Sequence, residues 1–573
     1  MEFKSTDQQS NIINADLAPQ CIIACPGSGK TATAVRRLLE VRRRLAETRG
    51  HIALFSYSNV AVETFRLQYK VLKAGMPAWA NRVLIETADA FLTTYILRPH
   101  GAHVMGASRL PFLVVGNEPF LRGITIFDGT RPRSMDELRI RLLDDGNFEF
   151  SVQAESKKAT VVDAKAALKA IEKMGRMGAY TYELARYWAI QTLVQNDRLC
   201  EILCRRFPHL LVDEAQDIGP LHGSLITIFA QGGSVVSLIG DPNQGIYDFA
   251  GADGTFLRRY AEVKGVVSFP LSENRRSMGA IVGVGNALAV TTSSAFRKEC
   301  GRTHGCFYIR YDEGDLDALL ATFAVILEAN GYSRSEGIVL CRGNGTVEKL
   351  KGGASDVGRG ATGKFAVAAV ARDRNLDMAS SFESATLALA KLLSEPSDTL
   401  HRDLLDASVT GEVKVLRRLL WGFIRNPATG LPDSRLRARG RWQPELKKRL
   451  CTFLDEVELR TSFRRSATWT NNVTLADVGD SPLWEADFAA DGTEGIRIDT
   501  VHQAKGEGIP AVLYLARTAD LNKLLGGTGT EDGRIGYVAI TRAENLLIVA
   551  VPNTASKAVS EALEVKGFNS WPG

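Results

Sequence analysis

The 573-residue sequence has no apolar run that approaches the length of a membrane span. Its first residues, MEFKSTDQQS, also lack the apolar core of a signal peptide. We therefore expect a cytoplasmic protein without membrane partners.

Cysteine and histidine are both scarce, with eight residues of each. Zinc and iron–sulfur sites need clustered thiolate or imidazole ligands. Three cysteine pairs are closely spaced but have no clustered histidines beside them: Cys21 and Cys25, Cys200 and Cys204, and Cys300 and Cys306. We expect buried thiols and treat a metal site as the weaker alternative.

Charge of one sign is not in large excess either, since the formal net charge is only +5. This value neither demands nor excludes a nucleic-acid partner, because a basic channel needs only local clustering. The hydrophobic share of 45% is ordinary for a globular protein. The length exceeds what one core supports, so roughly three to five lobes are expected.

The most informative segment that is present is residues 209–217 (HLLVDEAQD). It predicts a short buried strand that ends in two adjacent carboxylates, Asp213 and Glu214. Adjacent side chains of a strand point in different directions, so one acid can bind Mg²⁺ through water while the next polarises an attacking water. Taken alone, the segment fits an acidic loop on any α/β protein equally well.

A phosphate-binding loop upstream decides between these interpretations. Residues 24–31 (ACPGSGKT) follow the P-loop pattern, with Ala24 in place of its first glycine, between a predicted strand and a predicted helix. In this pattern backbone N–H groups wrap the β-phosphate at the helix N-terminus. Lys30 would reach the β- and γ-phosphates, and Thr31 would place its hydroxyl on Mg²⁺. The ATP contacts expected here are Pro26, Gly27, Ser28, Gly29, Lys30 and Thr31.

Residues 358–364 (GRGATGK) have the same glycine and lysine spacing. However, Phe365 stands where a magnesium-binding hydroxyl is needed, and the preceding KGGASDV is not a strand pattern. We predict a flexible loop here and no second nucleotide site.

Further motifs follow in order along the chain. Gln9 stands 21 residues before Lys30 (30 − 9). The others are residues 56–61 (SYSNVA), 87–91 (TADAF), 240–249 (GDPNQGIYDF), 271–277 (LSENRRS) with Asn286, 338–342 (IVLCR), 500–507 (TVHQAKGE) and 537–543 (YVAITRA). In content and order this series resembles the UvrD/Rep family of superfamily 1 DNA helicases, almost from end to end.

Strand patterns that alternate with helical stretches indicate α/β layers. The resemblance implies two RecA-like parallel-sheet lobes of the P-loop NTPase type, each with a mainly helical inserted subdomain. The expected boundaries are 1–95 and 199–280 for the first, ATP-binding lobe, 96–198 for its insertion, 281–345 and 496–573 for the second lobe, and 346–495 for a reduced second insertion.

The resemblance also implies how ATP is hydrolysed. In-line attack by water requires the developing charge on the γ-phosphate to be neutralised from several sides. Arg542 would come from the second lobe, so hydrolysis would require the lobes to close and would be coupled to a hinge. The implied catalytic set is Lys30, Glu214 (the general base), Gln244, Arg276 and Arg542, with Thr31 and Asp213 on Mg²⁺.

Three residues are expected to contact the rest of the nucleotide. Gln9 is similar to the family's adenine-reading glutamine. Arg275 stands where family members usually have a tyrosine that stacks on adenine, and a guanidinium plane can also stack on a base. Glu507 lies one residue earlier than the acid of the usual KGLE, which implies a changed contact.

Binding of single-stranded DNA regardless of sequence relies on stacking and phosphate contacts. The resemblance makes Tyr57, Tyr247 and Phe249 the stacking candidates, with Phe91 behind them; without it, each would be taken as a core aromatic. The polar DNA-contact candidates are Asn59, Thr87, Thr500 and His502. The basic stretch 435–442 (RLRARGRW) fits either a solvated face or a contact to duplex DNA.

The function implied by the resemblance is an ATP-dependent translocase on single-stranded DNA and a 3′→5′ DNA helicase, acting at junctions of single- and double-stranded DNA, as in DNA repair. A second hypothesis is a DNA-stimulated ATPase that serves as sensor or switch for a partner nuclease, as in Gabija-type anti-phage defence. The short second insertion and the lack of room for a nuclease lobe after residue 543 motivate it. A scaffold with a dead P-loop is disfavoured, since every expected phosphate-contacting residue type is present.

Overall fold

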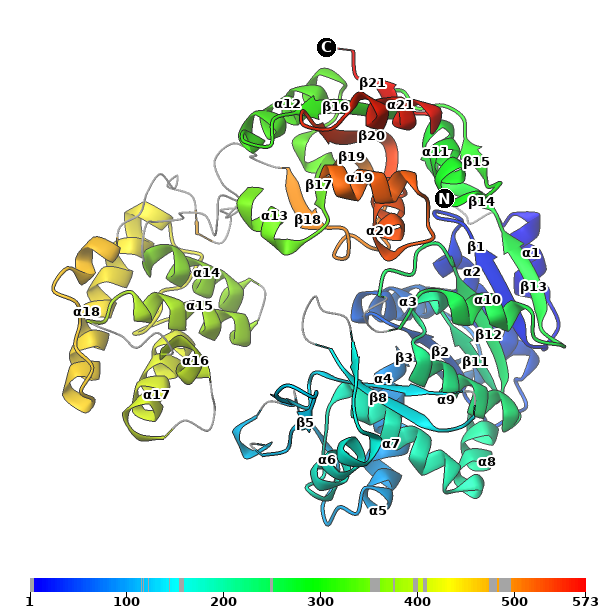
Figure 1. Cartoon of the computed structure of the whole chain (residues 1–573), viewed down its shortest axis with the longest axis horizontal. Helices are drawn as coiled ribbons and strands as arrows, with labels where there is room; N and C mark the ends of the chain where they lie inside the picture. Colours follow the sequence, from blue (N-terminus) through cyan, green and yellow to red (C-terminus); the bar gives the residue numbers. More distant parts are fainter. Residues whose placement is uncertain are drawn as a thin grey trace. The chain divides into compact units, whose positions relative to one another are not determined.

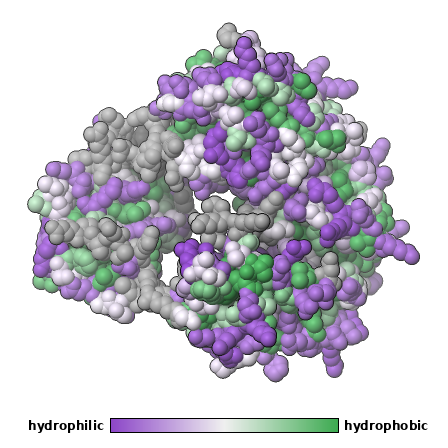
Figure 2. Space-filling view, viewed as in Figure 1, coloured by the Kyte–Doolittle hydropathy of each residue, from purple (hydrophilic) through white to green (hydrophobic). Residues whose placement is uncertain are grey.

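The computed structural model describes residues 5–572 except 115, 117, 122, 144, 154–158, 248–250, 351–360, 375–376, 395–399, 406–409, 474–481 and 484–495. The chain divides into two compact units: unit 1 is Met1–Tyr311 with Val501–Gly573, and unit 2 is Asp312–Thr500. Hydrophilic side chains cover much of the face seen in Figure 2, with apolar ones in smaller patches. Within the described ranges, no helix has the length and apolar character needed to cross a membrane.

A six-stranded parallel sheet forms the centre of the first part of unit 1 (Figure 1). Its order is β13 (Val267–Leu271), β1 (Gln20–Ala24), β12 (Val235–Gly240), β11 (His209–Val212), β2 (Ile52–Ser56) and β3 (Val83–Thr87). Every neighbouring pair is parallel. The carboxyl ends of the strands therefore meet at one edge, where ligands of open α/β sheets bind.

Both faces of this sheet are covered, which is why its strands are apolar along their whole length. Successive strand residues alternate between two cores: Leu211 packs with helices α2 (Lys30–Arg44) and α3 (Asn59–Leu72), whereas Leu210 and Val212 pack with α9 (Pro220–Gln231) on the other side. This alternation fixes the directions in which the residues after each strand point.

The segment between β3 and β11 adds both helices and strands to unit 1. Its helices are α4 (Ala88–Leu92), the π-helix η2 (Thr93–Gly101), α5 (Ala102–Val104), α6 (Ala164–Arg176), α7 (Tyr182–Val194) and α8 (Asp197–Arg206). Antiparallel strands β7 (Leu138–Leu142), β8 (Phe148–Val152) and β9 (Thr160–Val161) form a small sheet. The hairpin of β5 (Ile126–Phe127) and β6 (Pro132–Arg133) and the parallel pair of β4 (Phe112–Leu113) and β10 (Ala179–Tyr180) complete it.

The remaining part of unit 1 is a second parallel arrangement. Strands β19 (Ile509–Leu515), β20 (Ala543–Pro552), β16 (Gly305–Tyr311) and β21 (Asn569–Ser570) pair in that order. Strand β14 (Glu273–Met278) pairs with β15 (Ser294–Arg297). The helices here are α1 (Asp7–Asn14) and α10 (Thr255–Ala261) beside the first sheet, and α11 (Gly279–Ala289), α19 (Thr518–Leu525), α20 (Glu531–Ile540) and α21 (Lys557–Val565) in the second part. The predicted α/β fold with parallel RecA-like sheets is thereby confirmed.

Unit 2 contains the parallel pair β17 (Gly337–Cys341) and β18 (Arg497–Thr500) and a group of helices. The helices are α12 (Leu316–Ala329), α13 (Asn344–Leu350), α14 (Ala361–Asp373), α15 (Met378–Ala390), α16 (Leu400–Leu405), α17 (Gly411–Arg425) and α18 (Gln443–Arg460). The predicted flexible loop at 358–364 is wrong over residues 361–364, which begin α14; residues 358–360 lie outside the described residues. Phe365 and several alanines of α14 are buried in the core, and this packing outweighs the glycine-rich pattern.

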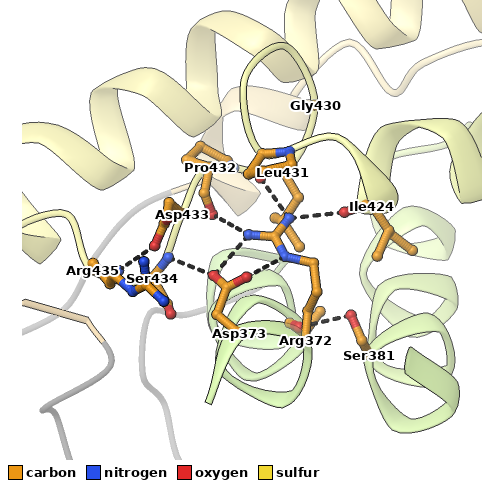
Figure 3. Close-up of polar contacts among 12 residues, drawn as sticks. Arg372, Asp373, Ser381, Ile424, Gly430, Leu431, Pro432, Asp433, Ser434 and Arg435 are labelled. Carbon is orange, nitrogen blue, oxygen red and sulfur yellow. Dashed lines mark hydrogen bonds and ion pairs between the residues drawn. The ribbon is translucent and has the colours of Figure 1, made fainter. Parts of the chain in front are cut away.

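A buried arginine holds this helical group together (Figure 3). Arg372 is only 8% exposed. Its guanidinium donates to Asp373 at 2.6 and 2.8 Å and to the carbonyl oxygens of Ile424, Leu431 and Pro432 at 2.8, 2.7 and 3.1 Å. Asp373 also accepts from the backbone N–H of Ser434 at 2.8 Å. The arginine thus satisfies a free carbonyl at the end of α17 and fixes the loop that follows.

Candidate nucleotide and DNA site

The predicted P-loop joins β1 to α2. Gly27 and Gly29 have φ angles of +68° and +80°, a conformation that glycine adopts at little cost. A Cβ on Gly27 would lie 2.5 Å from the Cβ of Arg276, and the Gly27 carbonyl accepts from the Arg275 N–H at 3.0 Å. The loop is therefore braced by residues that lie almost 250 positions later in the chain.

Gln9 lies against the same loop and is buried. Its backbone and side chain form a capping box with Thr6, which starts helix α1. Its Nε2 then donates to the carbonyl oxygen of Ser28 at 3.1 Å. The N-terminal helix thus brings the predicted adenine-reading glutamine to the P-loop.

The two acids after β11 point in different directions, as predicted from their adjacency. The Asp213 N–H continues the sheet by donating to Phe55 at 2.8 Å, and Asp213 is 3% exposed. Its Oδ1 is buried and has no hydrogen-bond partner. Glu214 adopts a left-handed conformation, φ +52°, which is uncommon for a residue other than glycine and turns its side chain away from the strand.

Gln216 joins the tips of β11 and β12. Its Nε2 donates to Glu214, and its Oε1 accepts from the N–H of Asp241 at 3.0 Å. A Cβ on Gly240 would lie 2.5 Å from this Oε1, so the glycine makes room for the contact. Sequence reasoning left the role of Gln216 open, because its partner on β12 is distant in the chain.

Asp217 makes a buried ion pair with Lys505, which sequence reasoning did not select as a site residue. The Lys505 Nζ lies 2.8 and 2.5 Å from the two carboxylate oxygens. The same Nζ lies 4.8 Å from the centre of the Tyr247 ring. Burial raises the pKa of Asp217 to about 6, although Lys505 opposes the shift. The lysine of TVHQAKGE was the available signal.

Arg542 reaches the first sheet through Gln244. Its Nη2 donates to Gln244 Oε1 at 3.1 Å, and Gln244 Nε2 donates to Asp241 at 2.9 Å. Arg542 is 1% exposed, and its other hydrogen bonds include the carbonyl oxygens of Val538 at 3.1 Å and Glu507 at 3.2 Å. Burial, together with the positive charge of Arg276, lowers the pKa of Arg542 to about 9. This guanidinium is thus short of negative charge.

Arg276 lies close to the same segments, donating to the carbonyl oxygens of Gly506 at 3.0 Å and Thr541 at 3.4 Å. Burial lowers its pKa as well. Two arginines and Lys30 therefore surround the acids that follow β11 and β12. Such convergence of cations beside a P-loop is suited to a polyphosphate.

The acids fit a divalent cation. Burial and the neighbouring Glu214 raise the pKa of Asp213 to about 8, while Lys30 opposes this. For Glu214 burial also disfavours the charge, but Lys30 and Lys505 outweigh it and lower its pKa. In the described part of the chain no three Cys, His, Asp or Glu side chains form a metal cluster. Mg²⁺ fits this donor set, because it is commonly bound by one or two carboxylates with phosphates and water.

Candidate DNA contacts of the first lobe lie at the same sheet edge. Tyr57 follows β2, and its ring meets His222 edge-on at 5.2 Å. Asn59 is the exposed first residue of α3, and Thr87 caps α4 by accepting from Ala90 at 3.2 Å. Phe91 is 2% exposed and belongs to the core behind Tyr57.

The other candidates are spread more widely. Tyr247 lies 5.7 Å from the ring of His502, whose Nε2 is 3.2 Å from the Ile246 carbonyl oxygen. Phe249 lies outside the described residues. Thr500 is buried in unit 2, where it pairs with Cys341. Arg275 places its guanidinium 4.2 Å from the centre of the Phe296 ring, and Glu507 contributes its carbonyl oxygen to Arg542.

The parallel sheets, the P-loop and the surrounding charges define a P-loop NTPase. Within that class the chain is a UvrD/REP-type helicase by sequence, since residues 5–263 match the family described as UvrD/REP helicase N-terminal domain. The chain is 23% identical over 590 residues to the ATP-dependent DNA helicase UvrD2 of Mycobacterium tuberculosis (strain ATCC 25618 / H37Rv), covering 94% of this chain and 77% of the relative.

Two shorter matches agree with this assignment. The chain is 22% identical over 330 residues to a probable DNA helicase II homolog of Mycoplasma capricolum, covering 52% of this chain and 42% of the relative. It is 27% identical over 146 residues to DNA helicase II of Escherichia coli (strain K12), covering 24% and 20%.

Proposed function

We propose that this protein is an ATP-dependent DNA helicase that translocates along single-stranded DNA. The names of its relatives support this proposal, and so does the chemistry of the site. The observation that carries it is the hydrogen-bonded series from Arg542 through Gln244 to Asp241, because it connects the last part of unit 1 to the P-loop sheet. A cation delivered in this way makes hydrolysis depend on how these segments are arranged.

The residues divide the work of hydrolysis between them. Lys30 binds the β- and γ-phosphates, and Glu214 orients the attacking water. Arg276 and Arg542 neutralise charge that develops on the γ-phosphate, and Gln244 positions Arg542. Thr31 and Asp213 hold Mg²⁺, which supplies further charge neutralisation when bound.

A path of contacts favours coupling between ATP and DNA. Asp217, three residues after Glu214, pairs with Lys505, and Lys505 lies over the ring of Tyr247. His502 lies beside that ring. A change in charge near Glu214 therefore has a short route to two of the proposed DNA contacts, Tyr247 and His502.

The test is ATP hydrolysis with and without single-stranded DNA. We expect strong stimulation by DNA in the wild type, and loss of turnover in Lys30→Ala and Glu214→Gln. Lys364→Ala is a matched control, because this lysine has the same glycine spacing before it but lies in helix α14. Hydrolysis that ignores DNA would contradict the proposal.

We further propose 3′→5′ polarity, on the basis of the likeness to UvrD/Rep helicases. Unwinding of duplexes with a 3′ tail but not of those with a 5′ tail is the expected result, with Arg542→Ala as an inactive control. The opposite preference would reverse the assignment of polarity and leave the ATPase assignment intact.

A second candidate is a DNA-stimulated ATPase that works with a separate nuclease. A short match favours it: the chain is 27% identical over 117 residues to an ATP-dependent helicase/nuclease component of Lactococcus lactis, covering 20% of this chain and 10% of the relative. Tight co-purification of a nuclease, with negligible unwinding by the protein alone, would favour this candidate. Efficient unwinding by the lone protein would exclude it.

A further inference from the structure

An ion-pair network outside the nucleotide site connects the first insertion to the proposed DNA-contact motifs. Asp89, the central residue of TADAF, accepts two parallel hydrogen bonds from Arg186 of α7, at 2.9 Å from Nε and 2.8 Å from Nη2. The same carboxylate lies 3.0 Å from Nε2 of His222 on α9. Three segments that are 97 and 133 residues apart in sequence thus meet at one side chain.

The network extends into the insertion through Glu183. Arg186 donates to Glu183 at 3.2 Å, and the other oxygen of Glu183 accepts from the backbone N–H of Ile140 at 2.9 Å. Ile140 lies in the centre of β7. The chain of contacts therefore joins both the helical part and the small sheet of the insertion to α4.

At its other end the network meets Tyr57. An ionised carboxylate can only accept, so Nε2 of His222 carries the hydrogen that it donates to Asp89. This fixes the imidazole ring, whose plane stands at 75° to that of Tyr57, at a ring distance of 5.2 Å. The Tyr57 hydroxyl is buried without a hydrogen-bond partner, so ring packing is what orients this side chain.

The charges within the network favour a fixed arrangement. Although burial works against its charge, hydrogen bonds from His222 and Arg186 hold the pKa of Asp89 well below its usual range. Burial and the charge of Arg186 lower the pKa of His222, so the imidazole is neutral at pH 7. A two-pronged arginine–carboxylate contact adds geometric specificity that a lysine cannot supply.

We propose that Asp89 is a positioning residue that fixes Tyr57 and the first insertion for binding single-stranded DNA, and that Asp89 does not itself contact DNA. The inference rests on the proposed function, since it specifies how the DNA site of that function is held. Arg186 and His222 are the two arms of the device.

Asp89→Asn gives a test whose sign is informative. Removing a negative charge near DNA strengthens binding when only long-range electrostatics is involved. Loss of a positioning residue weakens binding instead, by about tenfold if the coupling is of ordinary size. The measurement is the dissociation constant for a fluorescent oligo-dT without nucleotide, alongside ATP hydrolysis without DNA, which we expect to stay unchanged.

Further variants separate positioning from general damage. Arg186→Lys keeps the charge but loses the fork, and we expect it to weaken binding as Asp89→Asn does. In a Tyr57→Ala background Asp89→Asn is expected to cause much less additional loss, because its effect acts in part through that ring. Asp128→Asn is the matched control: Asp128 is also paired with an arginine of the insertion, Arg133, at 2.5 Å, but lies outside the network. We expect it to bind normally.

The outcomes are distinct. Unchanged or tighter oligo-dT binding by Asp89→Asn, with wild-type protein that binds well, overturns the inference and leaves the proposed function standing. Equal weakening by Asp89→Asn and Asp128→Asn also overturns it, because the effect would then be general. Wild-type protein that binds no oligo-dT overturns the proposed function and the inference with it.

Discussion

Units 1 and 2 each contain a buried arginine, and the two differ in what surrounds them. Arg372 in unit 2 is paired with the carboxylate of Asp373 and with three carbonyl groups. Arg542 in unit 1 has only neutral acceptors among its hydrogen bonds and feels the charge of Arg276. A buried charge is costly unless it is paired. The first arginine is satisfied within the protein, whereas the second is prepared for an anion.

The largest expected effect follows from removing the unpaired arginine. Arg542→Ala should lower DNA-stimulated ATP turnover by about 10³-fold, the scale of a lost arginine finger. Its effect on stability should be smaller than that of the corresponding change at Arg372. Steady-state hydrolysis and thermal unfolding measure the two quantities. Arg542→Lys, which keeps a charge but not the planar fork, serves as the graded control, and turnover within tenfold of wild type for Arg542→Ala would remove the contrast.

Removing the paired arginine should have the reverse profile. Arg372→Met is expected to destabilise unit 2 by about 3–5 kcal/mol, because Asp373 is left buried and unpaired. Denaturant unfolding followed by proteolysis of 312–500 measures this. The double variant Arg372→Met, Asp373→Leu should recover part of the loss. A single variant as stable as the wild type would show that the pair contributes no stability.

The ion pair of Asp217 and Lys505 is intermediate, since it is both buried and close to the site. Lys505→Met should cost about 1.5–3 kcal/mol at pH 8, where Asp217 is left ionised without its cation. Because the folded-state pKa of Asp217 is already raised, to about 6, the folded protein binds more protons than the unfolded chain between about pH 4 and 6. Its contribution to stability therefore falls as pH rises through that range.

In Lys505→Met the folded-state pKa of Asp217 should rise further and extend this loss above pH 6. Unfolding free energies at several pH values check the prediction. The double variant Lys505→Met, Asp217→Asn should lose the added pH dependence, and its persistence would assign the effect to another group.

His209 represents a third way of burying a titratable group, which is to keep it neutral. Burial lowers its pKa to about 3. Between about pH 6.5 and 3 the unfolded chain therefore binds the extra proton, so stability is lost as pH falls, by up to about 1.4 kcal/mol per pH unit. In His209→Gln the acid slope of the unfolding free energy should decrease by about one proton. The exposed His304 provides a control variant, and equal slopes in both would refute the prediction.

The contrast between local and distant partners also explains what the sequence could predict. The P-loop and the acids after β11 follow from an apolar strand, two glycines and a helix start, all of them neighbours in the chain. Gln216, Lys505 and the partners of Asp89 could not be predicted this way, because their contacts join positions 25, 288 and 97 residues apart.

Errors in the prediction had the opposite origin, in local patterns that tertiary packing overrode. The glycines around 358–364 indicate a loop, yet Ala361 begins a helix whose alanines and Phe365 are buried. Phe91 occupies a position in a proposed DNA-contact motif, but its ring packs against Phe55 at 4.6 Å in the core. In each case the surrounding packing sets the conformation.

The hydrogen bond between Gln244 and Arg542 joins residues 298 positions apart, with the whole of unit 2 between them in the chain. A ribosome that has completed residue 311 must still make Asp312–Thr500 before the rest of unit 1 exists. At usual elongation rates of roughly 5–20 residues per second, that interval is on the order of 10–40 seconds. During it the nascent chain already has its P-loop but not the arginine that completes the site. Premature ATP turnover on the ribosome is thereby prevented by the order of synthesis alone.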